Sequence, residues 1–489
     1  MTILEFFKTV HPSVLAAKMI FRHLQEHYPV LKIADIADTT SGGTPNRGMP
    51  EYYNGDIPWV KSGELKDGLI TTCDEYITAA GLKNSSAKLF PKGTLLVAMY
   101  GANIGKTGVL DFDATTNQAV CAIFPKVDIS REFLYWYFKQ QRIDFIAVGK
   151  GGAQPNISQT IINNASIVVP DEKVQEKIVN FLERIEKGNG IDYDFFIPEV
   201  LKDVETIYKY KNSYVTLSDS FETQLTQLEN LNQAILQEAV QGKLVPQDPN
   251  DEPASELLKR IKAEKAKSGK KEKPLPPIKP EDIPFEIPEN WVWCRLGEII
   301  QYTENLDIQK YLSPDTIVNY VDIDAIDNQN FIIREAKQKS VRELSTRARR
   351  VLKPNFIAYS TVRPYLKNIA IVEDEKENYI GSTGFNVFKT LKVELKYAFY
   401  YLLTPYINNS FKDLMVGFNS PSITNVQFEK SLFPLPPLPE QKRIVAEIEK
   451  QLANTKQLKE HIIANQQATE QLLKALLHQA FEVREMEEV

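Results

Sequence analysis

The feature that most constrains this chain is an internal repeat. Residues 151–186 align with residues 417–449 at a constant offset of 266. Identical residues at this offset include Gly151 and Gly417, Pro155 and Pro421, Ile157 and Ile423, Pro170 and Pro436, Gln175 and Gln441, and Glu183 and Glu449. Such regular matching indicates that the chain contains two copies of one structural unit.

The two copies differ in length. The offset is 263 where 30–37 aligns with 293–300, and 241 where 233–240 aligns with 474–481. The fall from 266 to 241 places about 25 additional residues in the first copy, around 188–212. Their Gly, Asp and Pro content predicts an excursion between helices.

Each copy begins with a segment of mixed secondary structure. Short apolar runs at 95–100, 119–124 and 356–360 predict strands, and 131–145 and 397–407 predict short buried helices. The sequence therefore predicts an α/β (α+β) globular domain in each copy, arranged as a tandem repeat.

A long helix follows each globular segment and carries residues spaced alternately by three and four. This heptad seam is Phe221, Leu225, Leu228, Asn232, Ile235 and Ala239 in the first copy, and Leu458, Ile462, Asn465, Thr469, Leu472 and Leu476 in the second. A polar seam residue such as Asn232 commonly fixes register. We expect the two helices to pair as a coiled coil; the alternative is that each packs onto its own globular domain.

The segment 243–290 joins the copies and holds the densest basic run of the chain. A short helix is expected at 254–267, followed by a Lys-rich and then a Pro-rich stretch. The basic residues are Lys259, Arg260, Lys262, Lys265, Lys267, Lys270, Lys271 and Lys273. A solvated helix with a stiff linker explains this composition, and an arm that contacts phosphate or another subunit is the alternative.

Composition excludes several classes of protein. There is no run of ~18 apolar residues, so no membrane-spanning helix is expected. The N-terminus lacks the basic region of a secretory signal. Cys73, Cys121 and Cys294 are scattered without CxxC spacing, which suits the reducing cytoplasm and excludes a disulfide framework or zinc ribbon.

Motifs for catalysis are missing or incomplete. The segment 100–108 is one residue short of a phosphate loop. His23 and His27 share a helical face, but no HExxH accompanies them. Neither a nucleophile elbow nor a methyl-donor loop occurs. We therefore predict a binding and assembly protein with no catalytic residue, no metal and no cofactor of its own.

Loops rich in hydrogen-bond donors are the candidates for ligand binding. Small polar groups, glycine and arginine suit phosphates and base edges, although any single arginine more often contacts solvent or phosphate than a base. The candidates for DNA binding are Ser41, Thr44, Arg47, Lys61, Asn103 and Lys106 in the first copy, and Arg342, Arg347, Arg349, Arg350, Arg363 and Lys367 in the second.

Net charge bears directly on nucleic-acid binding. The chain has a formal charge of −6, whereas proteins that bind phosphate are usually basic. Residues 28–170 hold 13 basic and 13 acidic side chains, and residues 291–436 hold 18 and 16. The acidic excess thus lies outside the globular segments, but neither segment is strongly basic. We expect weak DNA binding by this chain unless partners add positive surface.

Distinctive motifs stand in order along nearly the whole chain. They are SGGTP and GDIPWVKSGEL within 41–65, LNQAILQEAVQGKLVPQDPNDEPASELLKRIKAEK at 231–265, IPENWVWCRLGEI at 287–299 and LPPLPEQKRIVAEIE at 435–449. Together these motifs resemble the specificity subunit of type I restriction–modification systems.

The resemblance implies an architecture. Target-recognition domains are expected at 28–170 and 291–436, and helical spacer regions at 171–242 and 437–483, paired antiparallel with pseudo-two-fold symmetry. An N-terminal helical extension (1–27) and a C-terminal tail (484–489) complete the chain. Each domain would read one half of a split target. The helix 217–242 would span ~39 Å at ~1.5 Å per residue, about one turn of DNA.

The resemblance also implies partners. Two methyltransferase subunits would dock on the helices and bring S-adenosylmethionine, and two motor-nuclease restriction subunits would bring ATP and Mg. This chain would bind double-stranded DNA without a cofactor, in the cytoplasm. Two rival classes are a methyltransferase fused to its own recognition domains, and a coiled-coil scaffold whose globular domains bind protein.

Overall fold

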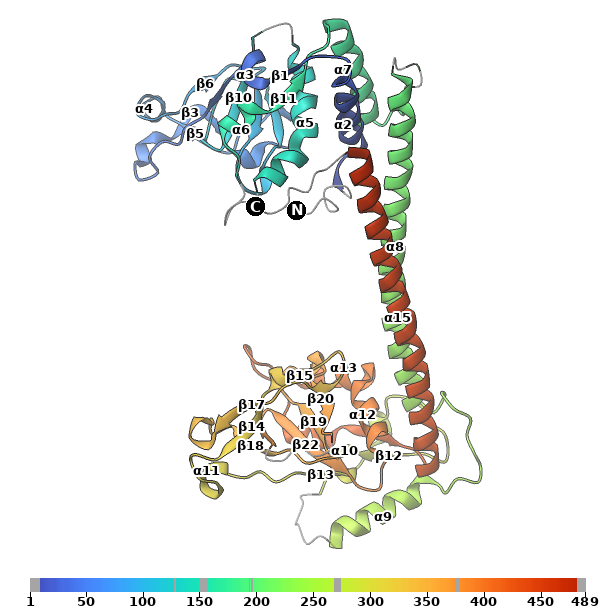
Figure 1. Ribbon diagram of the computed structural model, residues 1–489. Coiled ribbons are helices and arrows are strands. Elements are labelled where there is room, and N and C mark those ends of the chain that lie inside the picture. Colours follow the sequence, from blue (N-terminus) through green and yellow to red (C-terminus); the bar gives the residue numbers. More distant parts are fainter. Residues whose placement is uncertain are drawn as a thin grey trace. The chain divides into compact units, whose positions relative to one another are not determined.

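The computed structural model describes residues 9–126, 129–149, 156–192, 194, 197–267, 274–373 and 379–481. The chain divides into two compact units, Met1–Phe221 with Ala464–Val489, and Glu222–Ile463. Each unit holds one globular domain and parts of two long helices, α8 (Pro198–Val240) and α15 (Leu438–Phe481) (Figure 1). None of the helices in the described segments is long and apolar enough to cross a membrane.

A central sheet forms the body of each domain, and its first four strands follow the same order in both. In the first domain the order is β2-β10-β7-β8-β4, and in the second it is β13-β22-β19-β20. The first set is Ala37–Ser41, Val120–Pro125, Leu95–Ala98, Thr107–Leu110 and Gly68–Ile70, and the second is Ile300–Tyr302, Phe385–Thr390, Ile357–Ser360 and Ile369–Ile371. The strands expected at 95–100, 119–124 and 356–360 are β7, β10 and β19.

A second, four-stranded sheet also recurs with one order. It runs β5-β3-β9-β6 in the first domain and β17-β14-β21-β18 in the second. Its central pair is parallel in both domains, β3 with β9 and β14 with β21. The strands are Tyr76–Ile77, Tyr53–Val60, Ala114–Thr116 and Leu89–Phe90, then Lys337–Ser340, Ile317–Val321, Tyr379–Ser382 and Ala348–Val351.

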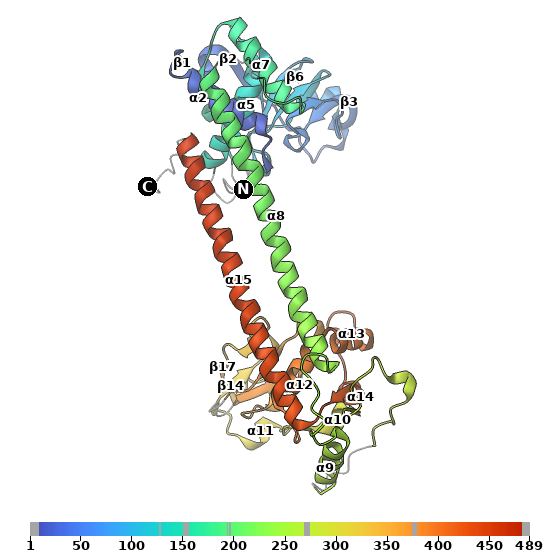
Figure 2. The same ribbon diagram turned by 90° about the vertical axis from the view of Figure 1, so that its right-hand side faces the viewer.

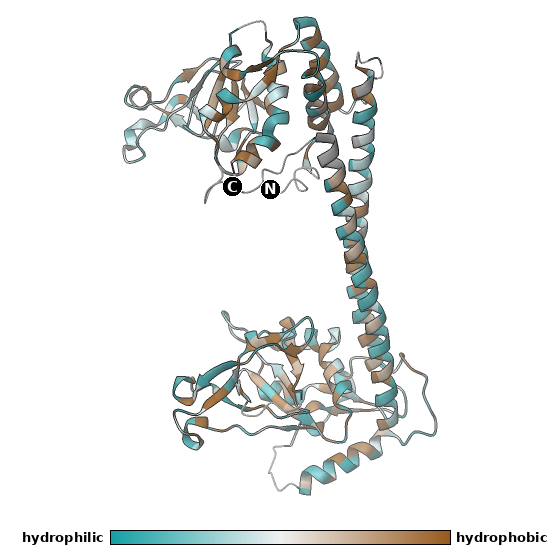
Figure 3. Ribbon diagram, viewed as in Figure 1, coloured by the Kyte–Doolittle hydropathy of each residue, from teal (hydrophilic) through white to brown (hydrophobic). Residues whose placement is uncertain are grey.

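Smaller elements complete the two domains. A two-stranded sheet closes each one, β1 (Val30–Lys32) with β11 (Ser166–Val168), and β12 (Val292–Arg295) with β23 (Leu432–Leu435). The second domain adds the pair β15 and β16, and short helices fill the connections. The strands β15 and β16 are Ile326–Asp327 and Ile332–Ile333. The short helices are α3 (Ile33–Ile36), α4 (Ala79–Lys83), α6 (Gln159–Asn164), α9 (Ala254–Lys267), α10 (Leu296–Ile299), α11 (Ile308–Tyr311) and α14 (Asn425–Lys430). Figure 3 shows hydrophobic residues gathered on the strands inside each domain.

The buried helix behind the central sheet is continuous in one domain and broken in the other. In the first domain it is α5 (Arg131–Val148). In the second it is α12 (Leu395–Leu403) followed by α13 (Pro405–Leu414). The prediction of one helix over 397–407 was therefore wrong. Pro405 has no N–H to donate within a helix, and it occupies the first turn of a new one instead.

One buried glutamine fastens each domain to the helix that follows it. Ser130 N donates to Gln175 Oε1 at 2.9 Å, and Gln175 Nε2 donates to Pro170 O at 2.9 Å. In the second domain Gln441 accepts from Glu394 N and donates to Pro436 O, both at 2.8 Å. The aligned glutamines therefore satisfy equivalent buried backbone groups in the two copies.

The helix α2 (Pro12–Leu24) has no counterpart among the described residues of the second copy. It packs against α5 and α7 (Glu172–Glu186). The ring centroid of Phe21 lies 4.8 Å from that of Phe133 and 5.6 Å from that of Tyr137. The first domain thus gains an additional helix from the N-terminal extension.

The additional residues of the first copy are only partly an excursion. Gly188 and Gly190 adopt positive φ angles after α7 ends, which is the conformation glycine favours beyond a helix. However, α8 begins at Pro198, so residues 198–212 are helical and the expectation of an irregular segment there was wrong. Val200, Leu201 and Val204 are buried in the first core because their spacing places them on one face of a helix.

The long helices α8 and α15 lie side by side (Figure 2). In the second unit, Thr455 Oγ1 donates to Asn232 Oδ1 at 2.7 Å. The end of α8, at Ile235 and Ala239, shares a core with the start of α15, at Ile444. The two helices are therefore antiparallel in this unit, with the polar seam residue of α8 matched by a polar partner.

The seam predicted for the second helix was only partly right: Ile462 and Thr469 are half-buried, whereas Leu458 and Leu472 are not. Leu458 is 50% exposed and Leu472 is 62% exposed. The buried positions are instead Ile448, Thr455 and Leu473, with Ile462 half-buried between them. The polar Thr455 belongs to the buried face, and the prediction began instead at the apolar but exposed Leu458. The side chain of Leu476 lies outside the described residues. On α8 the predicted Leu225, Leu228, Asn232 and Ile235 are all half-buried or buried.

Candidate nucleic-acid interface

Two motifs of the first domain are joined by close backbone packing. Gly42 and Gly43, which follow Ser41 at the end of β2, lie so close to Thr116 and Ser86 that a Cβ atom at either glycine would collide with them. Trp59 Nε1 donates to Gly43 O at 2.9 Å, and Thr44 Oγ1 donates to Gln118 Oε1. The turn therefore needs glycine at both positions, because the backbone passes too close to Thr116 of β9 and to Ser86 to leave room for a side chain.

A carboxylate holds two of the predicted cations together. Glu75 lies 2.8 Å from Arg47 Nη1 and 2.8 Å from Lys61 Nζ. The guanidinium of Arg47 also stacks over Tyr53 and Trp59, at 4.5 and 4.8 Å from the ring centroids. Hydrogen bonds from Lys61 and Arg47 lower the pKa of Glu75, and the same contact raises the pKa of Lys61. The cations are thus oriented and partly neutralised.

A groove of about 710 Å³ opens beside this cluster. Lys61 and Asn103 both line it, so the structure brings together two candidates that are far apart in sequence. Asn117 lines it as well, and its buried Oδ1 has no hydrogen-bond partner among the described residues. Buried polar atoms normally have partners, and this oxygen is left without one beside the groove. Lys106 is half-buried and is not part of the lining.

Sequence reasoning missed Glu75, Trp59 and Asn117. Trp59 stands in the GDIPW motif, so the motif was a usable signal. Glu75 was invisible because the search considered cations and small polar groups, and a carboxylate that organises them carries no pattern of its own. Asn117 follows β9, and only the fold brings it to the groove.

The corresponding sheet of the second domain carries the arginine cluster. The pairing of β18 with β21 shifts register between Ala348 and Arg350, which is a β-bulge at Arg349, and bulges redirect side chains. Arg349 lies 3.4 Å from Asp307. Burial lowers the pKa of Arg350, whereas Arg347 is exposed at the start of the strand. Arg342 pairs with Asp315 at the surface.

The last two candidates of the second domain lie in one turn. Arg363 Nη2 donates to Asn419 O at 2.9 Å. Lys367 Nζ donates to Gln233 Oε1 on α8 at 3.3 Å, and burial lowers its pKa. Lys367 therefore contacts the long helix, and Arg363 fastens the 416–422 loop.

The basic run before the second domain is largely paired within its own unit. Leu257, Leu258 and Ile261 bury one face of α9. Arg260 contacts Glu252 at 2.5 Å and Lys262 contacts Glu298 at 2.7 Å. In the described part of this run, the structure favours the helix over the phosphate-binding arm; Lys270, Lys271 and Lys273 lie outside the described residues.

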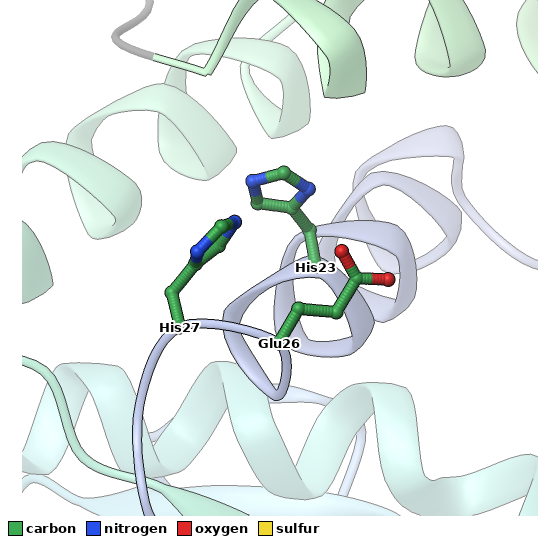
Figure 4. Close-up of side chains that lie close together, drawn as sticks. All are labelled: His23, Glu26 and His27. Atoms are coloured by element: carbon green, nitrogen blue, oxygen red, sulfur yellow. The ribbon is translucent and has the colours of Figure 1, made fainter.

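Two sequence features bear on cofactors. The segment 100–108 runs from β7 into β8, and it therefore lacks the helix that receives phosphate in a phosphate loop. In contrast, ligand atoms of His23, Glu26 and His27 lie within 4.8 Å of one another at the end of α2 (Figure 4). Imidazole and carboxylate groups suit a divalent transition metal, so these are the residues of the described chain with the arrangement to hold one.

Comparison with known proteins places these features in a family. The sequence profile of the type I restriction modification DNA specificity domain matches residues 25–192 and 288–465, which are the two globular domains with part of their helices. The chain belongs to the family of type I restriction–modification specificity subunits. It is 30% identical over 462 residues to the EcoAI specificity subunit of Escherichia coli, covering 84% of this chain and 70% of that protein.

Other relatives match shorter segments. The EcoEI specificity subunit of Escherichia coli is 50% identical over 108 residues, 20% of this chain and 18% of that protein. The crystal structure of the HsdS subunit from Thermoanaerobacter tengcongensis is 35% identical, with a TM-score of 0.36 over 40% of this chain and 50% of that one. As a specificity subunit, this chain serves in DNA recognition.

Proposed function

We propose that this chain is the non-catalytic subunit that reads a split DNA target and positions the other subunits of a type I complex on it. Each globular domain reads one half of the target. The observation that carries this proposal is the duplicated scaffold: two sheets recur with the same strand orders, while the polar side chains they present differ. Duplicated scaffolds with different surfaces suit two half-sites of different sequence.

The chemistry of the two surfaces supports DNA as the ligand. The groove of the first domain offers Lys61 with the amides of Asn103 and Asn117. Cations contact phosphate oxygens, and amides read base edges. In the second domain, Arg347 and Arg350 flank a bulge that sets their direction. Paired carboxylates such as Glu75 limit the net charge, so affinity depends on positive surface from partners.

The long helices support docking of partner subunits. Leucines stand exposed on both helices in each unit, at Leu217 and Leu472 in the first and at Leu231 and Leu458 in the second. These leucines are apolar side chains outside the mutual seam of the helices, and they suit contact with a helix-binding partner. Methyltransferase subunits, with S-adenosylmethionine, and restriction subunits, with ATP and Mg, supply the catalysis in this proposal.

A footprint of variants tests the assignment of one half-site to each domain. In complex with the methyltransferase, Arg347→Ala should weaken protection of one half of the target and leave the other half protected. Lys61→Ala is the matched variant and should affect the opposite half. Equal loss at both halves for either variant would contradict the proposal. If the methyltransferase complex shifted DNA of every sequence equally in a gel, the globular domains would not be reading DNA. That result would favour the protein-binding scaffold instead.

A further inference from the structure

Among the described residues of the second domain, Phe418 is the most exposed large apolar side chain. It lies at the tip of the 416–422 loop. Its side chain is fully exposed, at 101% of the reference value, and Val416 beside it is 69% exposed. Leaving a phenylalanine in water forgoes the stabilisation that burial of so large a ring provides. A single ring held out in this way indicates a partner.

The loop that carries Phe418 is firmly held. Val416 and Ser422 exchange two backbone hydrogen bonds of 3.0 Å at its base. Arg363 N donates to Pro421 O at 2.8 Å, and Arg363 Nη2 donates to Asn419 O at 2.9 Å. Gly417 adopts a φ of 111°, which other residues rarely do. The ring is therefore presented by a structured loop, with a guanidinium at its base.

The turn beneath the loop is strained, and the first domain shows how the strain could be avoided. Arg363 and Lys367 have φ angles of 46° and 53°. Equivalent strands place Gly101 and Gly105, with φ of 66° and 71°, at the same positions of the first domain. The shared hydrogen bonds are Ala98 N to Lys106 O at 2.8 Å and Ser360 N to Asn368 O at 2.9 Å. Glycine accepts this conformation freely, whereas arginine does not.

The sequence differs at the tip as well. At the offset of 266, Phe418 and Val416 align with Gly152 and Lys150. The second domain thus replaces glycine three times, by Arg363 and Lys367 in the turn and by Phe418 at the tip. The loop that carries Phe418 is hydrogen-bonded to Arg363. Strain retained at a non-glycine position points to function.

We propose that Phe418 is an apolar wedge that contacts bases of duplex DNA at the second half-site, with Arg363 binding an adjacent phosphate. This inference rests on the proposed function. The occupant is DNA because a cation stands at the base of a single projecting ring. Inserted apolar side chains of this kind unstack a base step, and flanking arginines bind the backbone.

The test measures DNA affinity as a function of salt for the complex of the full chain with its methyltransferase. The probe is an oligonucleotide duplex that carries the motif methylated by this complex. Phe418→Ala should weaken binding about tenfold, equivalent to ~1.4 kcal/mol, and leave the slope of log affinity against log salt unchanged. Phe418→Trp should restore binding. Val426→Ala, at an exposed residue of α14, is the control and should bind like the wild type.

Arg363→Gly separates the phosphate contact from folding. Glycine relieves the strained φ but removes the side-chain hydrogen bond to Asn419 O, so this variant should melt close to the wild-type temperature. Its DNA affinity should nevertheless fall, and the salt slope should decrease by about one phosphate contact.

Three results would overturn the inference. Wild-type affinity in Phe418→Ala would show that the ring does not contact DNA. Loss of the methyltransferase from Phe418→Ala in size-exclusion chromatography would identify a protein partner instead. A wild-type complex that binds every duplex equally would refute the proposed function together with the wedge, whereas motif-specific binding that ignores Phe418 refutes the wedge alone.

Discussion

The two globular domains share a scaffold and differ in what it presents. Both fasten their helix with a buried glutamine, Gln175 or Gln441, at the same place. Their turns differ, because the positions of Gly101 and Gly105 in the first domain are occupied by Arg363 and Lys367 in the second. Groups that hold the fold together were retained in both copies, while groups at the surface changed even where the backbone conformation favours glycine. This division is what two readers of different half-sites require.

The largest effect is expected where the two domains agree. Gln175→Leu and Gln441→Leu each remove the partner of a part-buried N–H and of a buried carbonyl, at a cost of about 2–4 kcal/mol. Each variant should lower the melting temperature of its own unit in calorimetry. The exposed neighbours Glu176→Gln and Lys442→Gln serve as controls. A large loss in one unit only would break the equivalence of the two scaffolds.

A smaller effect is expected where the turns differ. Gly105→Lys copies Lys367 into the first domain. A Cβ atom at Gly105 would lie 2.8 Å from Arg142 Cγ, and the positive φ adds about 1–2 kcal/mol. We expect a loss of about 1–3 kcal/mol in chemical denaturation. If Gly105→Lys were as stable as the wild type, the glycine would not be needed for close packing in the first domain.

The smallest effect concerns the carboxylates that pair with cations. Glu75→Gln frees Arg47 and Lys61, so DNA binding should tighten about two- to fivefold at low salt, with a salt slope steeper by about one contact. Asp307→Asn should tighten DNA binding less than Glu75→Gln, because the carboxylate of Asp307 is farther from its cation, at 3.4 Å from Arg349 Nη2. Fluorescence anisotropy across a salt series measures both. Unchanged or weaker binding by Glu75→Gln would contradict a neutralising role.

The pH dependence of the same pair has a definite sign. Lys61 and Arg47 hold the pKa of Glu75 below its usual value. The stability that ionised Glu75 contributes is therefore fully present at pH values above the pKa that Glu75 has in the unfolded chain. That contribution disappears as the pH falls through the lower folded pKa. The difference in stability between Glu75→Gln and the wild type should therefore vanish in acid.

Sequence reasoning succeeded where one pattern was repeated and failed where geometry decided. The repeat indicated two copies of one α/β unit, and the strands β7, β10 and β19 followed from their apolar runs. The seam of α15 was misplaced because Thr455 is polar and Leu458 is not, although Thr455 is the residue that meets Asn232. Pro405 carried a readable signal for the break between α12 and α13.

The candidate DNA-binding residues were only partly placed by sequence. Lys61 and Asn103 line one groove, and that proximity depends on the pairing of strands far apart in the chain. Lys367 turned toward α8 because its neighbours in space are set by the tertiary fold. Phe418 gave no signal in sequence, since a phenylalanine is ordinarily a core residue and its exposure is visible only in the structure.

Methylome sequencing of cells that produce this chain with its methyltransferase tests the central claim most directly. A subunit with two reading domains predicts one methylated motif made of two defined halves separated by a fixed number of unspecified bases. Replacement of the segment 291–436 by that of a relative should change one half and leave the other half intact. A continuous motif, or a motif whose two halves change together, would contradict this account.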